Sequence, residues 1–139
     1  MKVDIVGEDQ VTQTIIERLL SFYRKDITIK ERLPARGGQI KANAKKYNLL
    51  LSPVILLTDL DNYSCPPSLI ADWFNGTEIN NKFLFRIAQE EAETWLMADR
   101  EGFSKWLNVD LDLIPQPSTI DKKKNIQEIV FPYKPSLYM

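Results

Sequence analysis

Apolar residues in the first ninety positions follow two alternating periodicities. Short runs rich in β-branched and other apolar residues are typical of strands and occur at 2–6, 27–33, 54–61 and 82–88. Between and after these runs, apolar positions recur at spacings of three and four, which predicts helices near 11–23, 39–47, 65–74, 90–98 and 103–107. This order predicts an α/β fold with a Rossmann-like parallel sheet of about four strands, flanked by helices on both faces.

The composition changes towards the end of the chain. From residue 113 onward the sequence is rich in Pro, Ser and Lys, which is typical of a linker or exposed loop. The last residues, YKPSLYM, contain a proline followed by apolar residues and resemble the first turn of a helix. We therefore expect an α/β domain over 1–112, and a linker over 113–139 that ends in a truncated helix.

The balance of charges, the absence of histidine and the single cysteine limit the kinds of site that the chain can form. The chain has 18 Lys and Arg against 19 Asp and Glu, so any binding of a polyanion must come from a local basic patch. It has no histidine, which excludes imidazole bases and imidazole-bound zinc within the chain. A single cysteine excludes an internal disulfide framework. Acid–base or metal chemistry must therefore use carboxylates, lysines or water.

Cellular location is also constrained by these patterns. No apolar run approaches the ~20 residues of a membrane-spanning helix, and acidic residues follow the N-terminus at once. With one cysteine and no secretory signal, we expect a cytoplasmic protein without a membrane partner.

Acidic residues gather where the predicted strands end. Asp59 and Asp61 close the apolar run VILLT, and strand alternation would turn both side chains to one side. Glu8 follows the first strand, which is commonly a neighbour of the third, although an acid there can also serve its own helix as a dipole partner. Glu91 and Glu93 follow the fourth strand, but on a regular helix they would lie about 200° apart. Because ligands bind beyond the carboxyl ends of parallel strands, these acids predict a site for a cation such as Mg²⁺.

Basic residues concentrate around a glycine pair. The loop Gly37-Gly38 leads into a predicted helix and could hold a phosphate through backbone N–H groups, although the sequence lacks the ending of a Walker A motif. A solvated lysine face explains the same pattern. The candidate substrate-binding residues are Arg36, Gly37, Gly38, Lys41 and Lys45.

A Glu after the first strand and an Asp-x-Asp after a later apolar strand together resemble the Toprim domain, the metal-binding α/β module of topoisomerases, primases and OLD-type nucleases. The segment EAETWLMAD, 91–99, is similar to the E-x-E-x-W-L-x-A-D signature of small stand-alone bacterial Toprim-like proteins of unknown function. The Gly-Gly loop also fits these proteins. The resemblance covers residues 2 to 106, although Thr12 and Gln13 stand where relatives often carry a second acid.

The resemblance implies a metal-dependent nuclease that cleaves phosphodiester bonds in DNA or RNA. It assigns Mg²⁺ or Mn²⁺ to Glu8, Asp59 and Asp61, with Glu91 and Glu93 as further acidic site residues. It also implies a role in phage defence and, in some members, a partner ATPase. The sequence leaves the oligomeric state open.

Two other functions fit the same residues. A strand ending in Asp-x-Asp is also typical of haloacid-dehalogenase-type phosphatases, with Asp59 as the nucleophile and Asp61 as the acid–base, although there the pair follows the first strand. The second is a non-catalytic or degenerate Toprim-like binding module, which the missing second acid near Glu8 favours. Such a module would show no metal-dependent rise in melting temperature.

Overall fold

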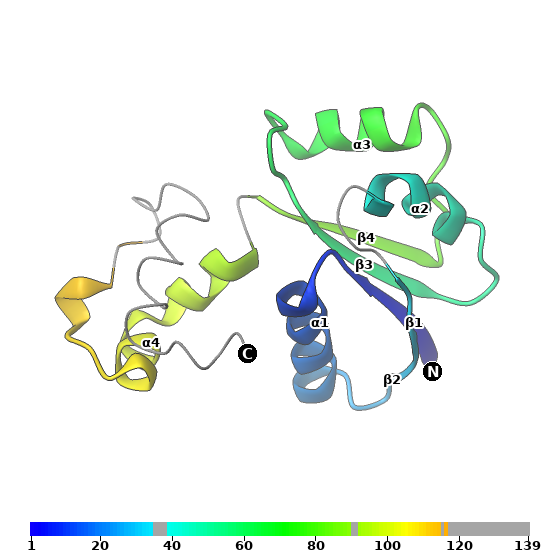
Figure 1. The fold of residues 1–139 in the computed structure, drawn as a ribbon. Coiled ribbons are helices and arrows are strands. Elements are labelled where there is room, and N and C mark those ends of the chain that lie inside the picture. The colour runs from blue at the N-terminus through cyan, green and yellow to red at the C-terminus, as the bar shows by residue number, and fades with distance from the viewer. Residues whose placement is uncertain (35–38, 90–91, 115, 117–139) are drawn as a thin grey trace. The chain divides into compact units, whose positions relative to one another are not determined.

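A four-stranded parallel sheet forms the centre of the first 89 residues (Figure 1). The computed structural model describes residues 1–34, 39–89, 92–114 and 116, and the chain divides into two compact units, Met1–Gln89 and Glu90–Met139. The strands lie in the order β2-β1-β3-β4, with all neighbours parallel. They are β1 (Lys2–Gly7), β2 (Thr28–Arg32), β3 (Val54–Asp59) and β4 (Phe83–Ala88). The predicted α/β fold is confirmed.

Helices cover both faces of this sheet. α1 (Gln10–Tyr23) packs against β1 and β3 on one face, and α2 (Gln39–Asn48) and α3 (Pro66–Phe74) lie on the other (Figure 1). The main core lies under α2 and α3, because strand alternation turns one set of side chains from β1, β3 and β4 towards these helices. Its buried members are Val6, Ile40, Ala44, Tyr47, Val54, Leu56, Leu60, Leu69, Trp73, Phe74, Phe83 and Phe85.

Parallel pairing brings the ends of different strands to the same edge. Gly7, the last residue of β1, pairs with Leu57 of β3, and Asp59, the last residue of β3, pairs with Ala88 of β4. β3 ends at Asp59, two residues earlier than the sequence indicates, and a turn follows it. The last residues of β1, β3 and β4 therefore lie at the same carboxyl edge of the sheet.

The second unit contains short helices. A 3-10 helix covers Ala92–Asp99, where the sequence predicts an α-helix, and α4 (Arg100–Leu107) follows it. The carboxylate of Asp99 caps α4 by accepting a hydrogen bond from the N–H of Gly102 at 2.9 Å. This cap fixes the start of the regular α-helix at Arg100.

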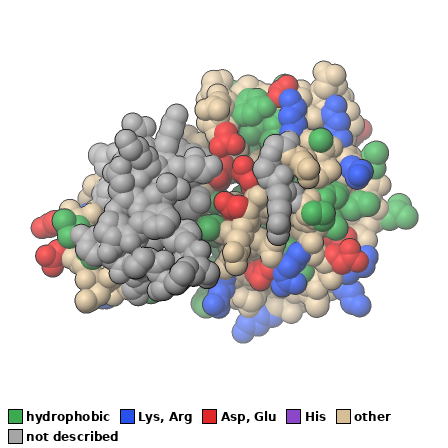
Figure 2. All heavy atoms as spheres, viewed as in Figure 1, with side chains coloured by type: hydrophobic (Ala, Val, Ile, Leu, Met, Phe, Trp, Pro, Cys, Tyr) green, Lys and Arg blue, Asp and Glu red, His purple; other side chains and the backbone are tan. Residues whose placement is uncertain are grey.

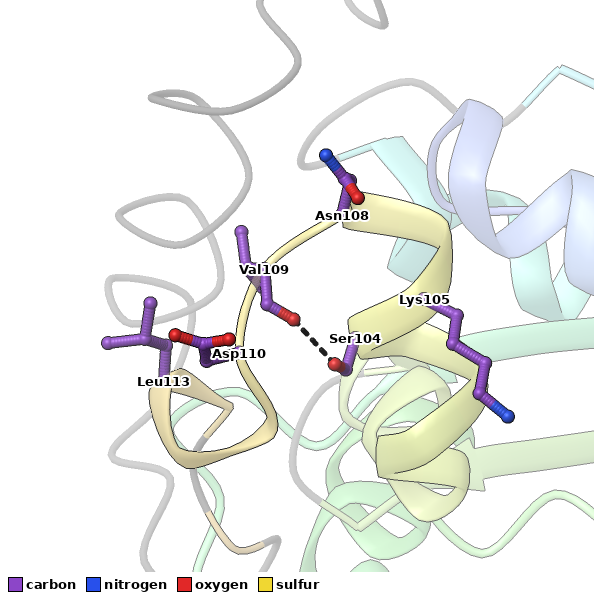
Figure 3. Close-up of a pocket in the computed structure, with 6 residues that line it drawn as sticks. All are labelled: Ser104, Lys105, Asn108, Val109, Asp110 and Leu113. Atoms are coloured by element: carbon purple, nitrogen blue, oxygen red, sulfur yellow. Dashed lines mark hydrogen bonds between the residues drawn. The ribbon is translucent and has the colours of Figure 1, made fainter.

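A polar hollow of about 450 Å³ lies beside the end of α4 (Figure 3). The hydroxyl of Ser104 donates a hydrogen bond to the carbonyl of Val109 at 2.6 Å and holds the turn that follows the helix. The residues that line the hollow are Ser104, Lys105, Asn108, Val109, Asp110 and Leu113. The predicted linker and truncated helix lie almost entirely outside the described residues. Within the described part of the chain, none of the helices has the length and apolar character needed to cross a membrane.

Candidate functional site

The side chain of Glu8 connects the ends of β1 and β3. Its Oε2 accepts a hydrogen bond from the hydroxyl of Thr58 and another from the backbone N–H of Asp59, both at 3.2 Å. Figure 2 shows acidic side chains gathered beside the carboxyl ends of the strands labelled in Figure 1. The prediction that Glu8 meets the end of the third strand is therefore confirmed in the geometry.

A second acid caps the helix that follows Glu8. Asp9 is the N-cap of α1, and its Oδ1 accepts a hydrogen bond from the N–H of Thr12 at 2.9 Å. The hydroxyl of Thr12 accepts in return from the N–H of Asp9, which completes a capping box. Because Asp9 satisfies the helix start, the carboxylate of Glu8 is available to the neighbouring strand.

Gly7 allows this arrangement by its lack of a side chain. A Cβ at position 7 would lie 2.4 Å from the backbone nitrogen of Gln13 and 2.7 Å from its Cα, closer than van der Waals contact allows. The first turn of α1 thus packs directly over the end of β1. This close approach sets where the chain turns from strand to helix, and Glu8 lies at that turn.

The two aspartates after the apolar run lie in different surroundings. Asp59 is the last residue of β3 and only 2% exposed. Because its N–H is bonded to Glu8, covalent reach keeps the carboxyl groups of Asp59 and Glu8 within about 8 Å of each other. Asp61 is exposed and has a left-handed backbone conformation with φ of 49°. The strand alternation predicted for the pair ends at Asp59, so the turn, and not the strand, orients Asp61.

Several candidate residues fall outside the described part of the chain. These are Arg36, Gly37, Gly38 and Glu91. Glu93 belongs to the 3-10 helix Ala92–Asp99 of the second unit, where only its backbone is described. The described site therefore consists of Glu8, Thr58, Asp59 and Asp61, all in the first unit.

Lys41, a predicted phosphate ligand, already has an anionic partner. Its Nζ lies 2.6 Å from Oδ2 of Asp72 on α3, and the hydroxyl of Tyr63 donates to the same oxygen at 2.5 Å. These two contacts lower the pKa of the Asp72 carboxyl, and Asp72 in turn raises the pKa of the Lys41 ammonium and of the Tyr63 phenol. The three side chains connect α2, α3 and the loop that follows Asp61. Lys45, on the same helix as Lys41, is exposed.

Sequence reasoning did not identify Thr58 or the pair Tyr63 and Asp72. Thr58 is the one hydroxyl residue in the run VILLTD and is 1% exposed, and a polar residue at the buried end of a strand is a signal that could have found it. Tyr63 and Asp72 stand nine residues apart with no recognisable local pattern, and only the packing of α3 beside α2 brings them to Lys41.

The donor chemistry of the site fits a hard divalent cation. Glu8, Asp59 and Asp61 offer only carboxylate oxygens, the ligands that Mg²⁺ prefers. Among the described residues, no three acidic, cysteine or histidine side chains lie close enough together to form a complete metal site. Mg²⁺ is usually held by one or two carboxylates together with water and substrate phosphate, so the pair Glu8 and Asp59 still fits this ion.

Searches against protein-family models, curated proteins and solved structures found no match to this chain.

Proposed function

We propose that this protein is a metal-dependent nuclease that hydrolyses phosphodiester bonds at the carboxyl edge of its sheet. One observation carries the proposal: Oε2 of Glu8 is bonded to the N–H of Asp59, so two carboxylates from different strands share one edge. In this proposal Glu8 and Asp59 hold the ion, and Asp61, which does not form a three-acid group with them in this structure, is a further acidic residue on the adjoining turn. The resemblance of the sequence to Toprim-like proteins implies Glu91 and Glu93 as further acidic residues, and both belong to the second unit.

The hydrogen bonds to Glu8 support its role as a ligand. The hydroxyl of Thr58 and the N–H of Asp59 both bond to Oε2, which fixes the orientation of the carboxylate. Oε1 can then face an ion, in the way that outer hydrogen-bond donors orient metal ligands in other sites. A bound Mg²⁺ or Mn²⁺ would supply Lewis-acid stabilisation of the phosphate and lower the pKa of an attacking water.

Substrate binding is proposed for the basic residues near the start of α2. Lys45 is exposed, and Arg36 precedes the glycine pair that leads into this helix. Lys41 contributes its charge to this region while its ammonium remains paired with Asp72. Each direct contact to a phosphate should steepen the slope of the logarithm of the binding constant against the logarithm of the salt concentration by about one.

A cleavage assay on the whole protein tests the proposal. Plasmid DNA and single-stranded RNA would be incubated with the protein and Mg²⁺ or Mn²⁺, and the products separated on a gel. Glu8→Gln and Asp59→Asn should each reduce cleavage by at least about 100-fold, because each removes charge that holds the ion. Glu101→Gln and Asp112→Asn, which change exposed acids of the second unit, serve as matched controls. Cleavage that survives both site variants and excess EDTA would contradict the proposal.

A non-catalytic binding module remains the second candidate. It is favoured by the lack of a three-acid group among the described residues and by Thr12 and Gln13, which stand where Toprim relatives often carry a second acid. Metal-dependent stabilisation separates the two functions. An ion present at 100 times its dissociation constant should add about 2.7 kcal/mol to the free energy of unfolding. A module that has lost its metal site should show no such gain, so adding Mg²⁺ should change the melting temperature of neither the parent nor Glu8→Gln.

A further inference from the structure

The most exposed large apolar side chains of the described residues belong to the amino edge of the sheet, opposite Glu8 and Asp59. Every other large apolar side chain in the described ranges is at most 52% exposed. The exposed set consists of Met1 (63%), Phe22 (76%), Tyr23 (72%), Leu49 (76%) and Leu51 (90%). We refer to these five residues as the amino-edge apolar set. Side chains of this kind that gather at one edge mark an interaction surface.

Topology explains why these residues come together. α1 and α2 follow β1 and β2 and run back to the amino edge, so Phe22 and Tyr23 lie at the end of α1. Leu49 and Leu51 lie between α2 and β3. β1 lies between β2 and β3, and neighbouring strands are about 4.8 Å apart. The connections that lead into the three strands therefore converge.

Backbone hydrogen bonds tie these connections to the start of β1. The N–H of Thr28 donates to the carbonyl of Met1 at 2.8 Å, and the N–H of Asp4 donates to the carbonyl of Pro53 at 2.9 Å. The rings of Phe22 and Tyr23 contact each other edge to face, with centroids 5.1 Å apart. The start of β2 and the segment before β3 are thus both bonded to the start of β1.

The charge of this edge is opposite to that of the candidate site. Exposed lysines stand at the start of β1, after α1, in the last turn of α2 and before β4: Lys2, Lys25, Lys46 and Lys82. None of them belongs to an ion pair within the described ranges. Arg24 is paired with Asp26 at 2.7 Å, and Glu78 is the remaining exposed acid of these connections. In Figure 2 hydrophobic and basic side chains are interspersed on the right-hand side of the view, with some acidic side chains among them.

The sequence predicts no membrane partner, but the exposed residues of this edge indicate one that needs no spanning helix. We propose that the amino edge docks on an anionic lipid surface, with the amino-edge apolar set in the interface and the lysines among the headgroups. Leucine and aromatic side chains that project between lysines are typical of proteins that lie on such surfaces. A bilayer accepts projecting side chains without a complementary pocket. A second copy of the same edge would instead oppose lysine to lysine. In this orientation Glu8 and Asp59, at the opposite edge, face away from the lipid.

Vesicle binding by the full chain tests this docking. The protein would be sedimented with vesicles of phosphatidylcholine alone and of phosphatidylcholine mixed with phosphatidylglycerol. We expect binding to the anionic vesicles that weakens as salt is added. Leu51→Ser should weaken it roughly tenfold, because it removes an apolar side chain from the interface. Leu113→Ser, the same change at a 52% exposed position of the second unit, should bind as the parent does.

Folding and self-association are measured on the same samples. Leu51 is 90% exposed, so Leu51→Ser should keep the circular dichroism spectrum and melting temperature of the parent. Equal binding to neutral and anionic vesicles would overturn the proposal, as would unchanged binding by Leu51→Ser. Light scattering that shows a dimer which Leu51→Ser dissociates, with no vesicle binding, would overturn it in favour of a second copy.

Discussion

The carboxylate of Glu8 accepts a hydrogen bond from the backbone N–H of Asp59, with 3.2 Å between Oε2 and the nitrogen. The two residues are 51 positions apart, and each follows or ends a strand of the same parallel sheet. The bond extends the connection between β1 and β3 beyond the last paired residues, Gly7 and Leu57. It also determines that the two carboxyl groups belong to one surface.

The hydroxyl of Thr58 should contribute to stability through Glu8. Thr58→Val keeps the shape of this 1% exposed side chain but removes the donor to Oε2. We expect a loss of about 1.5–3 kcal/mol in the free energy of unfolding, as for a hydrogen bond to a charged group. Urea unfolding of Thr58→Val in the parent and in Glu8→Ala gives a double-mutant cycle. If the cost of Thr58→Val is the same in both backgrounds, the two side chains are not coupled.

Gly7→Ala should destabilise the first unit strongly. The new Cβ would lie 2.4 Å from the backbone nitrogen of Gln13, so α1 must move away from β1. We expect a loss of about 1–3 kcal/mol, as in other overpacked cores, measured by thermal unfolding. Gly76→Ala is the control, since its Cβ meets no atom within 4 Å and only its positive φ of 77° opposes alanine. A smaller effect at Gly7 than at Gly76 would contradict this interpretation.

Asp4→Val should stabilise the protein. Asp4 lies within β1, is 3% exposed and has one carboxylate oxygen, Oδ1, without a hydrogen-bond partner. It pairs with Val54 and lies on the same face as Val6 of the core. Replacing a buried charge that lacks full pairing by an apolar residue should raise the free energy of unfolding by about 1–3 kcal/mol in urea. Asp4→Asn, which removes the charge and keeps the polarity, should gain less; a loss of stability in Asp4→Val would contradict the prediction.

The ion pair between Lys41 and Asp72 should make part of the free energy of unfolding depend on pH, with a loss of stability in acid. Lys41 and Tyr63 lower the pKa of Asp72 below its ordinary value of 3.8, so the folded state binds fewer protons than the unfolded state just below that value. The stabilisation is therefore complete above the ordinary carboxyl range and is lost as the pH falls through the lowered pKa. Asp72→Asn should flatten this part of the profile of melting temperature against pH. Glu78→Gln, at an exposed acid outside the described ion pairs, should not.

Local sequence patterns were sufficient to predict the strands, the helices between them and the edge of the sheet at which acidic residues gather. Runs such as KVDIV and VILLT predict strands by themselves, and helices of regular spacing between them require parallel pairing. Parallel pairing in turn brings Glu8 and Asp59 to one edge, because both follow the same strand direction. This much depends only on residues that are close together in the chain.

Tertiary structure decided how the acids at that edge are held. Glu8 turns to Thr58 and Asp59 because Asp9 already caps α1 and because β1 and β3 are neighbours in the sheet. Asp61 leaves the strand because β3 ends at Asp59, and Lys41 meets Asp72 because α2 and α3 pack on the same face. Lys41 and Asp72 are 31 positions apart in the sequence, and Glu8 and Asp59 are 51 positions apart. No spacing within one segment can encode such contacts, because they depend on the order of the strands and the faces that the helices cover.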